Sequence, residues 1–345
     1  MVAHRIAAWV VDRAMVEYMI WLLRDRHYEN NLATVRTVVK EKRLGDLSRF
    51  FIPPPPAPEW RDSLRILRRG QGYLEASFVV PSPVTSPHPE NNVVTGRLWR
   101  PAKGHPLASV LLLHGAMVGH YLWYNRLARR LARQGFQVVF PHLPYHFDRT
   151  PPGQIPGEFI VGGDFLQALD LVQQGVADLR SLLGRLRAES DRPLGVIGTS
   201  LGGYFAGWLA VLESSLDFAV LIEPAVDLAA ILYETPLGRL ARRSLQGLSE
   251  VDQNWLRQGV SSLSPGTYPL AVPLERVLIQ LPLFDKIVPP QGTLTAWERW
   301  GRPPLLRYPA GHLTLFFQSR LVPDVEAFVT RYSLLVVRRS LATAP

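Results

Sequence analysis

A serine between two glycines, at the end of an apolar stretch, is the part of the sequence best suited to chemistry. Gly198-Thr-Ser-Leu-Gly202 has the spacing G-x-S-x-G, with a strand pattern over residues 194–197 before it and an apolar helical pattern over residues 204–212 after it. A strand that turns sharply into a helix holds such a serine in a strained conformation, exposed beside the first amides of the helix. Because those amides can stabilise an oxyanion, Ser200 is the candidate nucleophile.

A serine nucleophile needs a base, and the base needs an acid that orients it. Asp285 follows one buried strand pattern, and His312 follows the last strand pattern, directly after Gly311. The carboxyl ends of neighbouring parallel strands meet at one edge of a sheet, so we expect Ser200, Asp285 and His312 to lie together there. Three residues far apart in the sequence are thereby predicted to form one site.

The acid has alternatives. Glu223 and Asp227 also follow a strand pattern, in the stretch Leu221-Ile-Glu-Pro-Ala-Val-Asp227. Asp285 is preferred because its surroundings have the form D-x-I-V-P, but a weak effect of Asp285→Asn would favour Glu223 or Asp227.

A second oxyanion donor is expected from the loop after the strand pattern of residues 109–113. This loop reads Leu113-His-Gly-Ala-Met117, in which Gly115 permits a tight turn. We expect the amide of Ala116 to point at the same spot as the amide of Leu201. His114 is interpreted as structural, orienting the loop and not acting as a base.

Alternating strand and helix patterns position these residues. Strands are predicted over residues 73–80, 93–99, 109–113, 136–140, 193–198, 218–222, 277–281 and 305–308, and helices over residues 122–133, from Asp164 onward, and from about residue 323. This alternation predicts an α/β fold with a mainly parallel central sheet flanked by helices. Helix-like material over residues 227–274 is predicted to form a small helical cap at the active-site end of the sheet.

Residues 1–56 are predicted to be a helical extension and a proline-rich connector, followed by the main domain over residues 57–345. Val11, Met15, Tyr18 and Leu22 form one helical stripe, while charged residues interrupt any run long enough for a membrane span or a signal peptide. We expect residues 1–26 to be a helix packed on the main domain. The alternative is a membrane-surface helix, which Trp9 and Trp21 would suit.

The composition is that of a globular protein, with 47% hydrophobic and 19% charged residues. The absence of cysteine excludes disulfides, thiolate metal sites and a cysteine nucleophile. The net charge of +9 comes from arginines dispersed through helices, so no nucleic-acid partner is expected. No metal or organic cofactor is expected either, because the histidines do not fall in ligand spacings. We expect a cytoplasmic protein, and its oligomeric state is left open.

Over residues 93–335 the chain resembles the α/β-hydrolase superfamily, through His114-Gly115, the G-x-S-x-G stretch, Asp285 and Gly311-His312. The resemblance implies the α/β-hydrolase fold and a serine esterase or lipase that works through an acyl-enzyme. It also implies that Ser200 is the nucleophile, His312 the base and then the acid, and Asp285 the orienting carboxylate.

The loop of residues 143–153, together with the N-terminal extension, is similar to a little-characterised bacterial branch of hydrolases. This loop is expected to present Tyr145, His146 and Arg149 near the mouth of the pocket, as candidate substrate-binding residues. Arg149 can pair there with a phosphate or carboxylate, or it can instead pin its own loop by hydrogen bonds.

The leading hypothesis is therefore a carboxylesterase-like hydrolase of a small-molecule ester. One alternative is a membrane-surface lipase or phospholipid acyl hydrolase. Another is a non-catalytic membrane-associated protein on a hydrolase fold. A peptidase or an acyltransferase can use the same three residues, because pocket details decide the acceptor.

Overall fold

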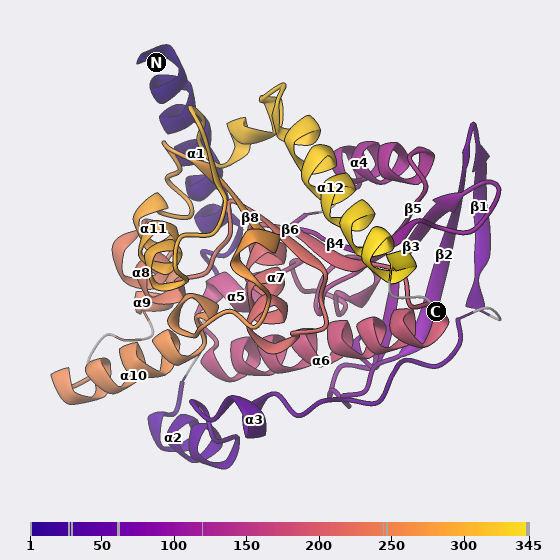
Figure 1. The fold of residues 1–345 in the computed structure, drawn as a ribbon. Coiled ribbons are helices and arrows are strands. Elements are labelled where there is room, and N and C mark those ends of the chain that lie inside the picture. The colour runs from indigo at the N-terminus through magenta and orange to yellow at the C-terminus, as the bar shows by residue number, and fades with distance from the viewer. Residues whose placement is uncertain are drawn as a thin grey trace.

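The molecule is organised around one nine-stranded sheet (Figure 1). The computed structural model describes residues 2–26, 28, 30–60, 63–118, 120–243, 245 and 248–342. The strands are β1 Arg65–Gly70, β2 Tyr73–Pro81, β3 Val93–Pro101, β4 Ala108–Leu113, β5 Phe136–Pro141, β6 Leu194–Thr199, β7 Phe218–Ile222, β8 Val277–Pro282 and β9 Leu305–Tyr308. The α-helices are α1 Val2–Leu22, α2 Leu32–Glu41, α3 Leu47–Phe50, α4 Leu122–Arg133, α5 Glu158–Gly162, α6 Phe165–Glu189, α7 Leu201–Leu212, α8 Leu228–Glu234, α9 Arg239–Arg243, α10 Glu250–Ser262, α11 Pro290–Arg299 and α12 Leu321–Ala342. Short 3-10 helices are η2 Pro89–Asn91, η3 Phe147–Arg149, η4 Pro265–Thr267, η5 Leu274–Arg276 and η6 Leu313–Phe317.

The sheet is mainly parallel, as predicted. Its strand order is β1-β2-β3-β5-β4-β6-β7-β8-β9. The pairs from β1 to β5 in this order are antiparallel, and every pair from β5 to β9 is parallel. Since parallel strands share one direction, the residues that follow β6, β7, β8 and β9 come out at the same edge of the sheet. That edge carries the site.

Helices cover both faces of the sheet because its strands are apolar on both sides. Neighbouring residues of β6 show this, since Val196 belongs to the apolar cluster with α6 and α7, and Ile197 belongs to the cluster with α4 and α12. In Figure 1, α6 runs along one face, while α4 and α12 lie over the other. The α/β fold class is therefore confirmed.

The stretch predicted as a cap contains α8, α9 and α10, with η4 at its end. These helices lie at the opposite end of the molecule from β1, and α1 stands beside them (Figure 1). Asp227 begins α8 as its N-cap, where its Oδ1 accepts a hydrogen bond from the amide of Ala230. The division of the chain near residue 56 and the cap boundaries stay predictions.

The first helix was predicted with the wrong buried stripe. Val11 is 37% and Tyr18 is 53% exposed. The side chains that α1 buries instead are Ala8, Asp12, Val16, Met19, Ile20 and Leu23. The helix carries apolar residues around most of its circumference, so periodicity could not identify the side that packs on the domain. The packed side also contains Asp12, and a charged residue normally indicates the exposed side of a helix. Strand β1 and the helices α2 and α3 were not predicted.

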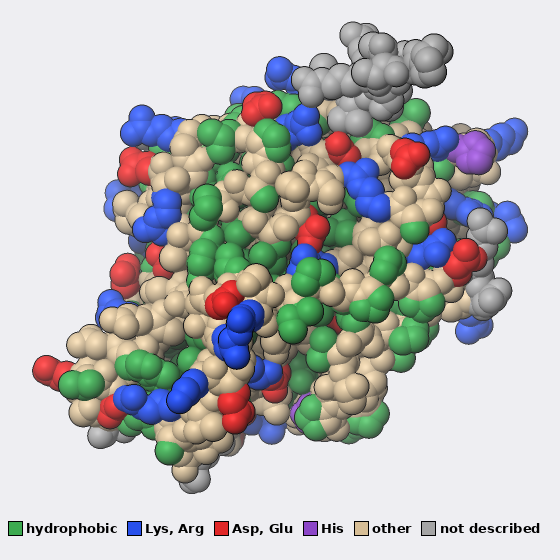
Figure 2. All heavy atoms as spheres, turned by 60° about the horizontal axis from the view of Figure 1, so that its bottom comes forward, with side chains coloured by type: hydrophobic (Ala, Val, Ile, Leu, Met, Phe, Trp, Pro, Cys, Tyr) green, Lys and Arg blue, Asp and Glu red, His purple; other side chains and the backbone are tan. Residues whose placement is uncertain are grey.

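The charge distribution agrees with a dispersed excess of arginine. On the face shown in Figure 2, basic and acidic side chains are intermixed with apolar ones. Across the part of the chain that the structure describes, no helix is long and apolar enough to cross a membrane.

Candidate active site

Ser200 lies in the sharp turn between β6 and α7. Its backbone has φ 52° and ψ −113°, a region that costs a non-glycine residue free energy and that the surrounding fold must enforce. The fold does so by close packing, because a Cβ at Gly202 would lie 2.3 Å from the carbonyl oxygen of Leu113. The turn therefore has the strained form that the sequence predicted.

His312 connects Ser200 to Asp285. Its Nε2 lies 3.0 Å from the Ser200 Oγ, and its Nδ1 lies 2.6 Å from Oδ2 of Asp285. An ionised carboxylate only accepts, so the proton resides on Nδ1 and leaves Nε2 to accept the serine proton. The other oxygen of Asp285 accepts the amides of Ile287 and Val288, both at 2.8 Å, which fixes the carboxylate.

A second buried carboxylate faces the same ring nitrogen. Oε2 of Glu223 lies 3.7 Å from His312 Nδ1, and neither oxygen of Glu223 has a hydrogen-bond partner among the described residues. Burial, reinforced by the charge of Asp285, raises the pKa of Glu223 well above its usual value. Of the three candidate acids, only Asp285 forms a hydrogen bond with His312, while Asp227 caps α8.

Burial lowers the pKa of His312, but the negative charges around the ring outweigh it and raise the pKa above 6.5, with Asp285 the largest contributor. Glu223 and Asp12 act in the same direction. Glu223, Asp285 and His312 also place three possible metal ligands within 4.8 Å of one another. However, His312 Nδ1 holds the proton that bonds Asp285, so that nitrogen cannot bind a metal while the pair is formed.

The loop after β4 packs directly against the serine turn. The amide of Gly115 donates to the Tyr124 hydroxyl at 3.0 Å, and that hydroxyl lies 2.8 Å from Oγ1 of Thr199, next to Ser200. Tyr124 therefore joins the two segments that carry Ala116 and Leu201. The sequence did not indicate this role, because a tyrosine on an amphipathic helix is typical of a core residue.

His114 has the structural role that was predicted. It is fully buried, its Nδ1 lies 2.8 Å from the carbonyl of Gly115, and its Nε2 accepts the amide of Leu143 at 3.0 Å. Burial lowers its pKa well below the usual value, so the ring is neutral.

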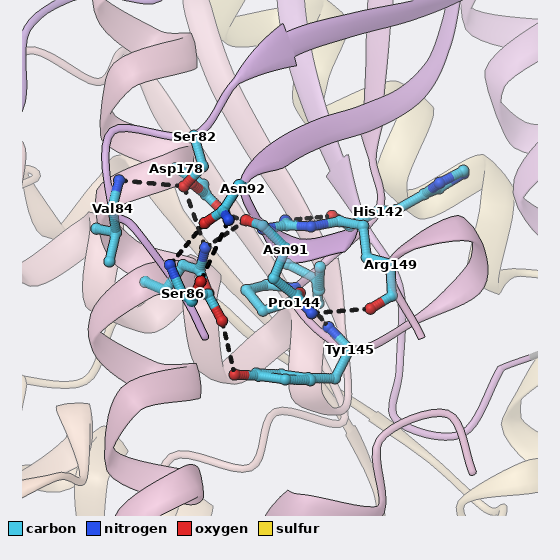
Figure 3. A network of polar contacts seen from close by, with 12 residues as sticks. Ser82, Val84, Ser86, Asn91, Asn92, His142, Pro144, Tyr145, Arg149 and Asp178 are labelled. Atoms are coloured by element: carbon cyan, nitrogen blue, oxygen red, sulfur yellow. Dashed lines mark hydrogen bonds and ion pairs between the residues drawn. The ribbon is translucent and has the colours of Figure 1, made fainter. Parts of the chain in front are cut away.

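Tyr145, His146 and Arg149 do not lie at the pocket mouth, and this expectation is corrected. Their side chains are 2%, 0% and 0% exposed. The guanidinium of Arg149 donates to Asp178 at 2.8 Å and to the carbonyls of Asn91 and His142, as Figure 3 shows. Arg149 therefore pins its own loop and cannot meet a substrate anion.

The other two residues of that loop are likewise structural. The amide of Tyr145 donates to Oδ1 of Asn91 within the same network (Figure 3). Nε2 of His146 accepts the amide of Met117 at 3.3 Å, and burial lowers the pKa of His146 to about 4. The loop of residues 143–153 thus packs against the loop of residues 113–117 through hydrogen bonds.

A largely apolar cavity of about 330 Å³ opens onto Ser200 and His312. Ala116 and Leu201 line it beside the serine, and Leu228, Ile231 and Leu237 line it from the predicted cap. Met15 and Met19 of α1 form a further part of its wall. This volume is near the lower end of the range for small-molecule sites, about 300–1,000 Å³.

Comparisons with known proteins agree with this architecture. Residues 110–340 match the model described as the alpha/beta hydrolase family. Two uncharacterized proteins of Mycobacterium tuberculosis, one from strain CDC 1551 / Oshkosh and one from strain H37Rv, are each 35% identical to the chain over 214 residues. The match covers 60% of this chain and 49% of each relative, so the chain spans about half the length of the curated relatives it matches.

Solved structures of esterases share the fold. Acetyl xylan esterase 1 from Thermoanaerobacterium sp. JW/SL YS485 has a TM-score of 0.59 at 16% identity, over 85% of this chain and 97% of that one. An acetyl xylan esterase from Paenibacillus sp. R4 has a TM-score of 0.57 at 18% identity, over 91% of this chain and 98% of that one. At such identities the likeness concerns the fold alone.

Proposed function

The chain belongs to the alpha/beta hydrolase family, and we propose that it is a serine hydrolase that cleaves carboxylic esters through an acyl-enzyme. The observation that carries the proposal is the hydrogen-bonded series Ser200–His312–Asp285 at the wall of an apolar cavity. Each member has the geometry that its role requires.

In the proposed reaction, Ser200 Oγ attacks the ester carbonyl and passes its proton to Nε2 of His312. The amides of Ala116 and Leu201 hold the negative oxygen of the tetrahedral intermediate. His312 then protonates the leaving alcohol, which leaves the acyl group on Ser200. A water molecule, deprotonated by His312, attacks this acyl-enzyme and releases the carboxylic acid. Asp285 orients His312 and stabilises its charged form.

The cavity favours an apolar acyl group of short to medium length, because it is small and lined mainly by apolar side chains. We expect a fluorophosphonate to label Ser200 and a series of p-nitrophenyl esters to be hydrolysed. Folded protein that neither reacts with the probe nor turns over any ester of the series would contradict the proposal.

A second apolar cavity of about 100 Å³ lies next to the first, and Leu228, Ile231 and Leu237 line both. We expect Ile231→Ala to join the two cavities and to shift the preferred ester toward longer acyl chains. Each methylene that gains a buried site adds about fourfold to kcat/KM, from about 0.8 kcal/mol. The measurement is kcat/KM across the ester series. Leu232→Ala, which enlarges only the second cavity, is the matched control. An unchanged acyl-chain preference in Ile231→Ala would contradict the prediction that Ile231 separates the two cavities.

The exposed face of α1 favours a second candidate function, a lipid-directed hydrolase that works at a membrane surface. Val2, Ile6, Trp9, Val10, Tyr18 and Trp21 are each at least 51% exposed. Arg13 and Arg24 are also exposed, and the guanidinium of Arg24 lies 4.8 Å from the ring centre of Trp21. Tryptophan and arginine on one helix face suit an anionic bilayer surface.

Flotation with anionic liposomes tests the membrane contact. We expect the wild-type protein to float with the lipid, and Trp9→Ala/Trp21→Ala to lower the partition at least about tenfold, because each indole buries apolar surface in the bilayer. Ile66→Ala/Leu67→Ala, on the exposed strand β1, is the control. Equal flotation of the two variants, or no flotation of the wild type, would rule out α1 as a membrane contact.

A further inference from the structure

Asp12 of the N-terminal helix is buried at the active site, although it lies 300 positions before His312. Its Oδ2 accepts the amide of His312 at 2.9 Å and the amide of Lys286 at 3.1 Å. Its Oδ1 accepts the amide of Leu313 at 3.2 Å. Three backbone donors converge on one carboxylate. Burial raises the pKa of Asp12, and the hydrogen bonds from His312 and Lys286 oppose that rise by stabilising the ionised form.

These donors belong to two different loops. Lys286 directly follows Asp285, whereas His312 and Leu313 belong to the loop that carries the base. One carboxylate therefore joins the acid loop to the base loop, without a hydrogen bond to either catalytic side chain. Rotation of one loop relative to the other would change the distance between Asp285 and His312, which is 2.6 Å between Oδ2 and Nδ1.

Close packing supports the contact. A Cβ at Gly311 would lie 2.6 Å from Oδ2 of Asp12 and 2.7 Å from Cβ of Ala8. Only glycine at position 311 lets α1 approach the base loop this closely. One and two helical turns further along α1, Met15 and Met19 face the substrate cavity. The same side of the helix thus contacts both the catalytic loops and the substrate space.

We propose that α1 is an integral part of the active site, in which Asp12 is a positioning residue that holds the Asp285 and His312 loops in register. This inference rests on the proposed serine hydrolase function. It predicts that the arrangement of Asp285 and His312 depends on a segment that precedes the hydrolase sheet in the chain.

Asp12→Asn is the test, since it keeps the shape of the side chain but removes its charge and one of its acceptor oxygens. We expect kcat for ester hydrolysis to fall about 10- to 100-fold, as for a small misplacement of catalytic groups, with little change in KM. We also expect the acid limb of the kcat/KM profile to move to lower pH. Asp12, Glu223 and Asp285 are the acids that face His312, and loss of a negative charge beside it lowers the pKa of its imidazolium.

Glu17→Gln is the matched control, because it removes a carboxylate from the exposed side of the same helix. A wild-type kcat and pH profile in Asp12→Asn would overturn the proposal. So would a lower melting temperature with an unmoved acid limb, since a purely structural role predicts that result.

A second readout does not depend on ester turnover. The NMR signal of the His312 Nδ1 proton, assigned by its loss in His312→Gln, should shift or broaden in Asp12→Asn and stay unchanged in Glu17→Gln. An unchanged signal in Asp12→Asn refutes the positioning role, even if no ester is hydrolysed. If the wild-type protein hydrolyses no ester but Asp12→Asn still changes this signal, only the proposed function is refuted and the positioning role stands.

Discussion

Ser200→Ala is expected to abolish both ester hydrolysis and labelling by a fluorophosphonate, with kcat reduced by about 10⁴- to 10⁶-fold. The substitution removes the one oxygen that lies 3.0 Å from Nε2 of His312. Neither the base nor the oxyanion amides can form an acyl-enzyme without it. The residual rate would come from binding and oxyanion stabilisation alone.

The fold of this variant should be unchanged, because alanine meets the same backbone constraint at φ 52° as serine does. Circular dichroism and thermal unfolding check this. Ser215→Ala, at an exposed serine, is the matched control and should keep wild-type activity and labelling. Labelling that persists in Ser200→Ala, or that is lost in Ser215→Ala, would assign the nucleophile elsewhere.

Local patterns were sufficient to predict that Ser200, Asp285 and His312 lie together at one site. The G-x-S-x-G turn needs only a strand before it and a helix after it, and both are visible as apolar periodicity within about a dozen residues. Asp285 and His312 could be added because parallel strands bring their carboxyl ends to one edge. The order of the strands in the sheet was not needed for that inference.

Residues whose role depends on a distant partner could not be predicted. The sequence left Arg149 open between a substrate anion and hydrogen bonds to its own loop, and only the fold shows that it lies 2.8 Å from Asp178 in the interior. Asp12 reads as a surface residue, because a carboxylate within an apolar stripe normally indicates the solvent side. Its partners are backbone amides, which leave no signature in the sequence. The exposed strand β1 lacks the apolar alternation on which strand prediction depends.

Helix α1 was difficult to predict for two reasons: it buries a carboxylate, and it carries apolar residues on both sides. One side carries Asp12, Met15 and Met19 to the catalytic loops and the cavity, while the other side exposes Trp9 and Trp21. Both sides contain apolar residues, so the sequence favoured a packed helix but left a membrane-surface helix open as the alternative. In the structure these are two faces of one helix, and variants on each face can be tested separately.

Asp285→Asn is expected to lower kcat by about 10³- to 10⁴-fold. The carboxylate fixes the proton of His312 on Nδ1, whereas an asparagine amide can donate to Nδ1 and so favour the tautomer with a proton on Nε2. In that tautomer His312 cannot accept the proton of Ser200. Loss of the charge also lowers the pKa of the imidazolium, so the acid limb of the residual activity should move to lower pH.

We expect Glu223 to determine the residual kcat of Asp285→Asn. Burial comes first and the charge of Asp285 second among the effects that raise the pKa of Glu223, so Asp285→Asn should bring this pKa down. Glu223, 3.7 Å from His312 Nδ1, then ionises at lower pH and can partially replace the missing carboxylate. We therefore expect the residual kcat of Asp285→Asn to rise with pH, and to fall again by about tenfold in Asp285→Asn/Glu223→Gln.

Glu223→Gln alone completes a double-mutant cycle with the wild type, Asp285→Asn and the double variant. It should change kcat by less than about threefold, because Glu223 forms no hydrogen bond with His312 and so contributes little to the orientation of the ring. Profiles of kcat against pH for the four proteins measure the coupling between the two acids. A loss in Glu223→Gln larger than the loss in Asp285→Asn would make Glu223 the orienting acid and Asp285 a loop residue. The distances of 2.6 Å and 3.7 Å to His312 Nδ1 predict the opposite order.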